Sequence, residues 1–309
     1  MRLNRTQWVI ALMLILSGLC GPAQAGQIVD TNMRQWAKQA IAQEAKLDLK
    51  ISKKAVAVMY FHNQTGNHSL DPLQKGLAIM LITDLGKIDT IHVVERARLQ
   101  ALMEELHLGT SGLVSAESAP RAGRLLGAGY LVGGELDSVG SSGFQIDSDL
   151  VQVENGRQVG GTSSQGKLAD LLRMEKKILF ELVRLLKLEL TPEQRNLLKQ
   201  PLSNNIEALI SFFKGIDEGD KGNYETAEQD YKRSMQMDPK FSLPADALRE
   251  LQDLGLVKGH SRSRSMIRKL RDRVTDNDEP IPEGAGRRDR TGSIIRQPVE
   301  NRALPPTGG

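Results

Sequence analysis

The stretch KKAVAVMYFHNQTG at residues 53–66 decides how this chain folds. Its centre, Ala55 to Phe61, is a nearly continuous apolar run, which is typical of a strand covered on both faces of a sheet. A polar loop follows, and a helix is predicted to begin at Pro72, because proline suits the first helical position and Asp71 can cap it. The stretch therefore predicts a strand that leads into a helix.

The same alternation continues along the chain. The helix predicted from Pro72 ends at Gly86 and carries an apolar stripe made of Leu73, Leu77, Met80, Leu81 and Leu85. A short strand, two helices and a longer strand are then predicted over residues 91–94, 96–106, 116–126 and 130–136, with Ser115 as the cap of the second of these helices. This order of elements predicts parallel strands joined by right-handed crossovers.

The end of this region has a different pattern. Two predicted strands, Phe144 to Val153 and Arg157 to Gln165, flank Asn155-Gly156, which is the strongest short hairpin signal in a sequence. A long amphipathic helix from Leu168 to about Leu188 is expected to cover the sheet. We therefore predict an α/β domain with a mixed sheet and covering helices over residues 51–190.

The first 25 residues have the three zones of a cleavable secretory signal. A basic start precedes an apolar run at residues 8–16, and Ala23-Gln24-Ala25 is a small-x-small cleavage site. The run is shorter than the roughly 18–20 residues that span a bilayer. We expect a signal peptide over residues 1–25 and a mature, exported chain that begins at about Gly26; the alternative is an uncleaved N-terminal anchor.

The only cysteine, Cys20, lies inside this predicted signal. Lipidation of Cys20 is a second alternative, but lipoproteins carry a small residue before the modified cysteine and here that residue is Leu19. Cleavage after Ala25 would leave a mature chain without cysteine, which excludes a disulfide framework and a thiolate metal site.

Three further regions surround the α/β domain. Residues 26–50 are predicted to form an N-terminal helix, with Met33, Trp36, Ala40, Ile41 and Leu47 on one face. Residues 191–256 have a wholly helical pattern that opens at Thr191-Pro192. Residues 257–309 lose apolar periodicity and are predicted to be a disordered basic tail, because such a segment buries too little surface to offset the entropy of ordering.

The charge of the chain is concentrated in this tail. From Lys258 onward there are 12 Lys and Arg against 7 Asp and Glu. The segment RSRSMIRKLRDR at 262–273 is suited to loose, salt-sensitive association with anionic lipid or an acidic partner; the alternative is a merely solvated tail. Aromatic residues make up 4% of the sequence, and their scarcity argues against the stacking surfaces that bind single-stranded nucleic acid.

The α/β region resembles the CsgG family of curli production and assembly components. Four stretches carry the resemblance: KKAVAVMYFHNQTG, VVERARLQALMEELHLGTSGL, AGRLLGAGYLVGGELDS and LVQVENGRQVGGTSSQGKLADLL. The Glu95-Arg96 pair after a strand and the Leu-Gly-Ala-Gly-Tyr entry to the next strand are its most specific parts. The resemblance implies an α/β fold shared with periplasmic envelope proteins and a role in building or exporting envelope structures.

The chain departs from this family at two links. Pore-forming members insert two long β-hairpins into the outer membrane, and each membrane strand needs about 9–11 residues. Here the corresponding links, SVGSSG and GGTSSQG, are short and polar. We therefore expect the periplasmic part of such a protein without its pore.

The helical region resembles a single tetratricopeptide repeat. Within ALISFFKGIDEGDKGNYETAEQDYKRSMQMDP, the residues Gly215, Ala227, Tyr231, Ser234 and Pro239 have the spacing of its packing positions. Small residues let two antiparallel helices approach, and proline ends the second. Flanking helices are expected over 196–214 and 243–254, and an ordinary helical hairpin on the α/β domain is the alternative.

No catalytic constellation is visible in the sequence. His62 and His68 share a loop but not a ligand spacing, so solvated histidines are favoured over a metal site. The glycines of Gly127-Ala128-Gly129 lie between a helix and a strand, which favours a tight turn over a phosphate loop. The adjacent Glu104 and Glu105 point in different directions, and Glu95-Arg96 is expected to cap or brace the following helix.

We therefore predict no catalytic residues, metal or cofactor. The leading hypothesis is a non-enzymatic periplasmic adaptor or assembly factor that contacts envelope or secretion proteins, or a second copy of itself, with at most peripheral membrane contact and no nucleic acid. Its predicted partner-binding residues are Phe212, Tyr224 and Gln229. The alternative is a curli-type outer-membrane export channel component, and an enzyme or small-ligand receptor is a third reading.

Overall fold

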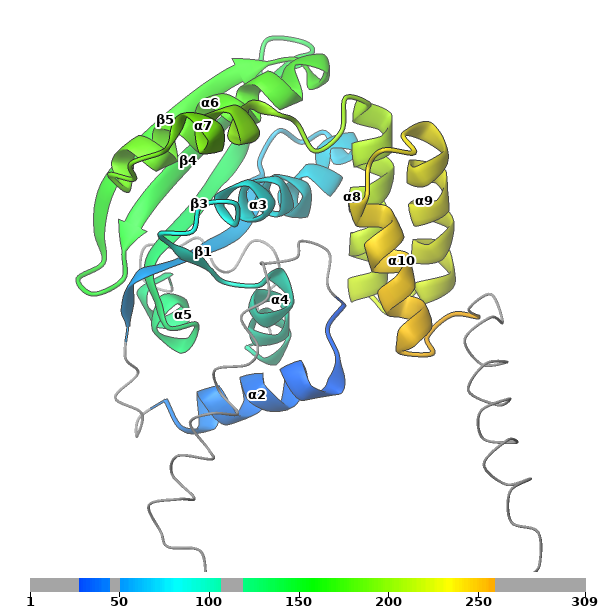
Figure 1. The fold of residues 1–309 in the computed structure, drawn as a ribbon, viewed down its shortest axis with the longest axis horizontal. Coiled ribbons are helices and arrows are strands. Elements are labelled where there is room, and N and C mark those ends of the chain that lie inside the picture. The colour runs from blue at the N-terminus through cyan, green and yellow to red at the C-terminus, as the bar shows by residue number, and fades with distance from the viewer. Residues whose placement is uncertain (1–27, 45–50, 107–118, 259–309) are drawn as a thin grey trace, which may run out of the picture. The chain divides into compact units, whose positions relative to one another are not determined.

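The computed structural model describes residues 28–44, 51–106 and 119–258. A mixed sheet of five strands in the order β2-β1-β3-β4-β5 forms its centre (Figure 1). The first three strands of that order are parallel, and β3-β4-β5 is an antiparallel meander. The strands are β1 Ser52–Asn63, β2 His92–Val93, β3 Ala128–Val139, β4 Gly143–Gln152 and β5 Arg157–Gly166. The predicted mixed sheet and its parallel crossovers are confirmed.

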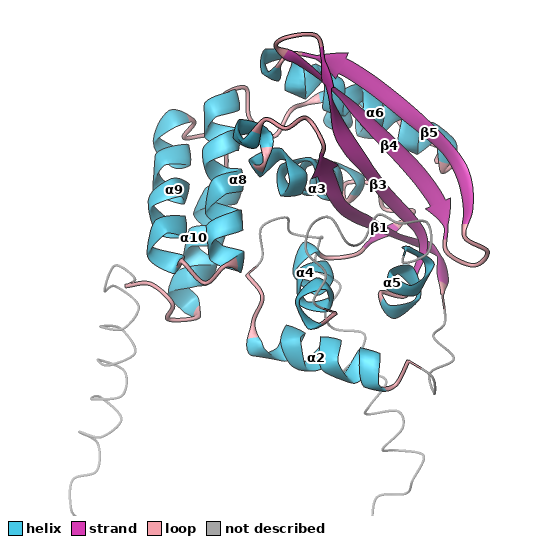
Figure 2. Ribbon diagram, turned by 180° about the vertical axis from the view of Figure 1, so that it is seen from behind, coloured by secondary structure: helices cyan, strands magenta, loops and turns pink. Residues whose placement is uncertain are grey.

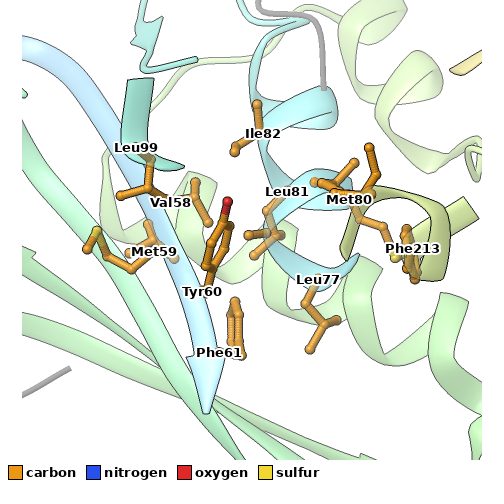
Figure 3. Packing of buried hydrophobic residues seen from close by; sticks show 14 of the residues in the cluster. Val58, Met59, Tyr60, Phe61, Leu77, Met80, Leu81, Ile82, Leu99 and Phe213 are labelled. Carbon is orange, nitrogen blue, oxygen red and sulfur yellow. The ribbon is translucent and has the colours of Figure 1, made fainter. Parts of the chain in front are cut away.

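Helices cover both faces of this sheet (Figure 2). Helices α3 (Pro72–Leu85) and α6 (Leu171–Leu185) lie on one face, and α4 (Arg96–Glu105) and α5 (Ala119–Leu125) lie on the other. Figure 3 shows the division at β1, where Met59 lies on the side of Leu99 and where Leu77 and Leu81 lie on the opposite side. The apolar run of β1 is therefore buried on both faces, as its sequence predicts.

Two turns follow their sequence signals. Gly127 has a φ of +68° at the junction of α5 and β3, a conformation that favours glycine, so the helix-to-strand turn is confirmed. At the β4–β5 hairpin Gly156 has a φ of +67°, and the Asn155 side chain accepts a hydrogen bond from the Arg157 N–H at 2.9 Å. Strand β3 is longer than predicted, so only residues 140–142 link it to β4.

Helix α3 departs from its predicted stripe and cap. Eleven of its residues are buried, because it contacts β1, α6 and the later helix α8 (Ile206–Asp220). Asp71 was expected to cap it, but its backbone is already helical and its side chain makes no capping bond. The Asp71 Oδ1 instead accepts a hydrogen bond from Asn63 Nδ2 at 2.7 Å, which fixes the end of β1.

The second region is helical, as predicted. Its helices are α7 Pro192–Lys199, α8, α9 Tyr224–Met237 and α10 Leu243–Asp253. The flanking helix expected over 196–214 is wrong, because Pro201 follows the end of α7 and α8 begins only at Ile206. The flank expected over 243–254 is confirmed as α10.

Helices α8 and α9 form an antiparallel hairpin through small residues. A side chain at Gly215 would meet the ring of Tyr231, and Ala227 is fully buried beside them. The Ser234 hydroxyl donates to the backbone oxygen of Ala208 at 2.7 Å. The hairpin packing is what the spacing predicts, whereas its assignment to the tetratricopeptide class stays a prediction.

The N-terminal helix is shorter than the predicted range of 26–50. Helix α2 is Thr31–Ala42, with Asp30 as its cap, and it packs on α4. Of the predicted face, Ala40 is buried and Met33, Trp36 and Ile41 are partly buried. The predicted signal with Cys20, the positions Leu47 and Ser115, and the basic tail lie outside the described residues.

A glycine pair tests the contact between α3 and α8. A methyl group at Gly76 would fall closer than 3.0 Å to the ring of Phe213, whereas one at Gly219 would meet only ordinary contacts at 3.5 Å or more. We expect Gly76→Ala to destabilise the protein by about 1–3 kcal/mol through overpacking, and Gly219→Ala to be neutral or stabilising by up to about 1 kcal/mol. Urea unfolding of both variants checks this; equal effects would contradict it.

Candidate functional site

A buried ion pair joins the α/β domain to the helical hairpin. Arg96, the first residue of α4, donates from Nη1 to Asp220 Oδ2 at 2.8 Å and from Nη2 to Asp220 Oδ1 at 3.0 Å. The Arg96 side chain is fully buried and that of Asp220 is 3% exposed. This two-pronged geometry is the one in which a guanidinium binds a carboxylate most specifically.

Neighbouring polar groups extend this pair. Arg96 Nη1 also donates to the Tyr60 hydroxyl at 2.9 Å, and that hydroxyl donates to Gln100 Oε1 at 2.9 Å. From α3, Lys75 Nζ donates to Asp220 Oδ2 at 2.9 Å and to Asp217 Oδ1 at 2.8 Å. Asp220 therefore receives two cations from two different helices of the α/β domain.

The electrostatics of this network keep its groups in one protonation state. Burial raises the pKa of the Tyr60 phenol well above its ordinary value, so the hydroxyl remains a donor. Burial alone would lower the pKa of Arg96, but the charge of Asp220 outweighs it and raises that pKa. Tyr60 and Arg96 therefore keep their protons near neutral pH, and the bidentate pair of Arg96 with Asp220 acts as a structural clamp.

The sequence predicted a structural role for Arg96 but not its pairing with Asp220. Glu95-Arg96 was expected to cap or brace α4, but the Glu95 side chain makes no capping bond and Arg96 reaches away to β1 and α8. Glu104 accepts from Gln100 and from Arg34 of α2, so it is not paired with Glu105 for acid–base work. No local pattern marks Asp220, because its partner lies 124 residues earlier.

A second buried cluster lies between α3 and α6. Asp84 is fully buried and accepts hydrogen bonds from Lys87 and Lys176. Glu175 is also fully buried, and its Oε2 lies 3.3 Å from Lys176 Nζ. Burial, with a smaller contribution from the charge of Asp84, raises the pKa of Glu175 to about 8. This carboxyl is therefore mostly protonated at neutral pH.

An acidic surface lies on the sheet face opposite α6. Glu135 and Asp137 of β3 and Asp147 and Asp149 of β4 lie on this face, with Glu135 directly opposite Asp147. All four are partly or fully exposed, and no described helix covers this part of the sheet. Burial, and then the charges of Asp137 and Asp147, raise the pKa of Glu135. This surface was not predicted from the sequence, although alternate acidic residues along two paired strands mark it.

The three predicted partner-binding residues lie in different settings. Phe212 is fully buried between the rings of Phe213, Tyr231 and Phe241, so the prediction that it contacts a partner is wrong. Its aromatic ring forms part of the core of the hairpin. Tyr224 is partly buried and Gln229 is exposed, both on α9. Their role stays a prediction.

The histidines do not converge. His62 is partly buried near Glu135, and the exposed His68 pairs with Asp71 at 3.1 Å. Within residues 28–44, 51–106 and 119–258, no group of three or more His, Cys, Asp or Glu is placed to hold a metal ion. In the same ranges, no helix has the length and apolar character needed to cross a membrane.

The fold and these surfaces define a class: a mixed α/β domain clamped to a helical hairpin. Residues 36–166 match the family model described as curli production assembly/transport component CsgG. The chain therefore carries a CsgG-like domain, as the resemblance in its sequence predicts. No curated protein matches the chain.

Several solved structures are similar to this chain. The LpoB C-terminal domain from Salmonella enterica is 14% identical, with a TM-score of 0.31, 44% of this chain covered and 98% of that one. The same domain from Escherichia coli is 14% identical, with a TM-score of 0.30 and coverage of 44% and 95%. Lipoprotein GNA1162 from Neisseria meningitidis is 14% identical, with a TM-score of 0.32 and coverage of 45% and 99%.

Removing one partner of the clamp should be costly. We expect Asp220→Asn to destabilise the protein by about 3–5 kcal/mol, because it leaves the buried Arg96 charge uncompensated. The double variant Arg96→Met/Asp220→Leu should recover most of this loss, since neither buried charge remains. Urea unfolding of the single and double variants checks the prediction, and additive losses would contradict it.

Glu175 should make stability depend on pH. Its pKa of about 8 in the folded protein exceeds its ordinary value of 4.5. Its contribution is therefore complete below about pH 4.5 and is lost as pH rises toward 8, at up to about 1.4 kcal/mol per pH unit. We expect Glu175→Gln to gain stability relative to the parent between pH 5 and 8. Glu181→Gln, a partly exposed control on the same helix that pairs with Arg184, should show no such gain.

Proposed function

We propose that this protein is a non-enzymatic adaptor or assembly factor of the bacterial cell envelope that acts through protein–protein contacts. The observation that carries the proposal is the CsgG-like domain at residues 36–166, whose family is described as a curli production assembly/transport component. Such a component has to hold other proteins in place. A domain that presents fixed surfaces is suited to that task.

The clamp supports this proposal physically. Arg96 and Lys75 bind Asp220 from two helices. The C-terminal end of α8 is therefore held against the α/β domain. A partner that binds α9 therefore meets a surface already fixed relative to the sheet, and pays little ordering entropy there. Tyr224 and Gln229 on α9 are the residues that we propose for this contact.

The proposed location in the cell rests on the N-terminal sequence and on the family match. We propose that residues 1–25 are a cleavable export signal and that the mature protein works in the periplasm, associated with the envelope. We also propose the division into an N-terminal segment at 26–50 that contains α2, an α/β domain at 51–190, a helical region at 191–256 and a basic tail at 257–309. Sequencing of the mature N-terminus by mass spectrometry tests the first of these proposals.

The family description also favours a second candidate, an export channel component. That function would need lipidation of Cys20 or membrane-inserting strands at the two short links. In the structure β3 and β4 are joined through residues 140–142, and β5 is followed directly by Lys167 and the turn Leu168–Asp170. We favour the adaptor, and palmitate labelling that is lost in Cys20→Ala would reverse this preference.

Site-specific photocrosslinking in intact cells tests the adaptor. A photoreactive residue at Gln229 should give discrete adducts with one or a few envelope proteins, because α9 presents this position to solvent. The same residue at Lys177, which is exposed on α6, is the matched control and should not give these adducts. Identical adduct patterns from both positions, or none from Gln229, would count against the proposal.

A further inference from the structure

Strand β5 has an open edge. Its ten residues, Arg157–Gly166, pair with β4 on one side only, and no described strand lies on the other side. Alternate N–H and C=O groups of an edge strand point away from the sheet, where they form a template for another strand. Natural edges are usually guarded by proline, lysine or bulges. The only register shift of β5 lies near its start, which leaves Gly160–Gly166 regular.

From Gly160 to Gly166 the side chains along this edge are uncharged, and all but that of Gln165 are small. On the face opposite α6 lie Gly161, Ser163 and Gln165, which pair with Asp149, Asp147 and Gln145 of β4. A methyl group at Gly161 would collide with the Asp149 carboxylate oxygen. The carboxylate of Asp149 therefore lies over the edge strand itself, within reach of a side chain on a strand added beside β5.

The charge of this face is unbalanced. Arg157, at the beginning of β5, is the only Lys or Arg in the sequence from residue 128 to 166. Asp147 and Asp149 accept hydrogen bonds from Gln145 and Gln158, at 2.8 and 2.6 Å, and those amides carry no charge. A strand added to β5 lies about 10 Å from β4, a distance that long basic side chains can bridge over Gly161 and Ser163.

We propose that the β5 edge binds an extended, basic segment of a protein partner, which adds to the sheet as a sixth strand. Main-chain hydrogen bonds along Gly160–Ser164 supply the attachment; next to them, the Gln165 oxygen already accepts a hydrogen bond from Arg173 at 3.3 Å. Lys or Arg at alternate positions of the segment, on the side of Asp149 and Asp147, supplies the selectivity. The proposal rests on the proposed function only in taking a protein as the partner, and it does not involve the surface of α9.

Peptide binding to the full mature chain tests this strand addition. The probe is a fluorescent ten-residue peptide of alternating Lys and Val, measured by anisotropy at low salt. Two further peptides carry backbone N-methyl groups on alternate residues, one peptide at the odd positions and the other at the even positions. Because only one edge of the added strand faces β5, one methylated peptide should bind like the parent and the other should lose about tenfold or more in affinity. Equal binding of both would overturn the proposal.

Charge variants test the basic character of the segment. Asp147→Asn/Asp149→Asn should weaken binding of the Lys peptide by about tenfold, while a peptide with Thr in place of Lys is unaffected. The control of equal charge is Glu193→Gln/Glu225→Gln, at exposed positions of α7 and α9. It should change the affinity by less than about twofold. An equal loss in the control would overturn the selectivity.

The edge itself can be observed by amide hydrogen exchange. Among residues 160–164, the alternate N–H groups that face away from β4 should become protected when the Lys peptide is added, and not before. A dimer of the mature chain that protects these residues without peptide would mean that a second copy occupies the edge, and would overturn the proposal. Either negative result leaves the Gln229 adducts unaffected, so failure of this proposal is distinguishable from failure of the adaptor.

Discussion

The bidentate pair of Arg96 with Asp220 is the constraint on which the arrangement of the two regions depends. A guanidinium and a carboxylate removed from water must satisfy each other, and removing one of them costs far more than the intact pair contributes to net stability. The pair therefore adds little net stability and a great deal of positional definition. Lys75 of α3 also donates to Asp220, so the α/β domain binds the end of α8 from two helices, and Tyr60 of β1 accepts a further hydrogen bond from Arg96.

The apolar contacts beside the pair follow from this constraint. Once Asp220 is held, the preceding turns of α8 lie along α3, and Gly76 leaves the space that the ring of Phe213 fills. Phe213 in turn contacts Phe212, which packs against Tyr231 of α9. A chain of aromatic rings thus links the sheet domain to the hairpin interior. Phe212 is unavailable to a partner for this reason, while the outer side of α9 stays open.

Much of this fold could be predicted from local patterns in the sequence. The apolar run of β1, the turn at Asn155-Gly156 and the spacing of Gly215 with Tyr231 each depend on neighbours near in the chain, and the predicted elements follow. Two of the misses share one cause. Asp71 and Arg96 were assigned to the nearest helix end, yet each is bound by a residue of another element, Asn63 and Asp220 respectively. A partner distant in sequence leaves no local pattern, so pattern reading could not find it.

The two faces of β4 carry different side chains, one face mainly apolar and buried and the other acidic and at least partly exposed. Along the face that α6 covers, β4 carries Phe144, Ile146 and Leu150, and the register of the meander is fixed because a slip by one residue would expose them. On the opposite face the same strand carries Asp147 and Asp149, which accept hydrogen bonds from the uncharged amides of Gln145 and Gln158. Burying one face fixes the strand, and a fixed strand holds its carboxylates at a set spacing beside an unpaired edge. The core and the proposed docking edge are therefore two consequences of one alternating pattern.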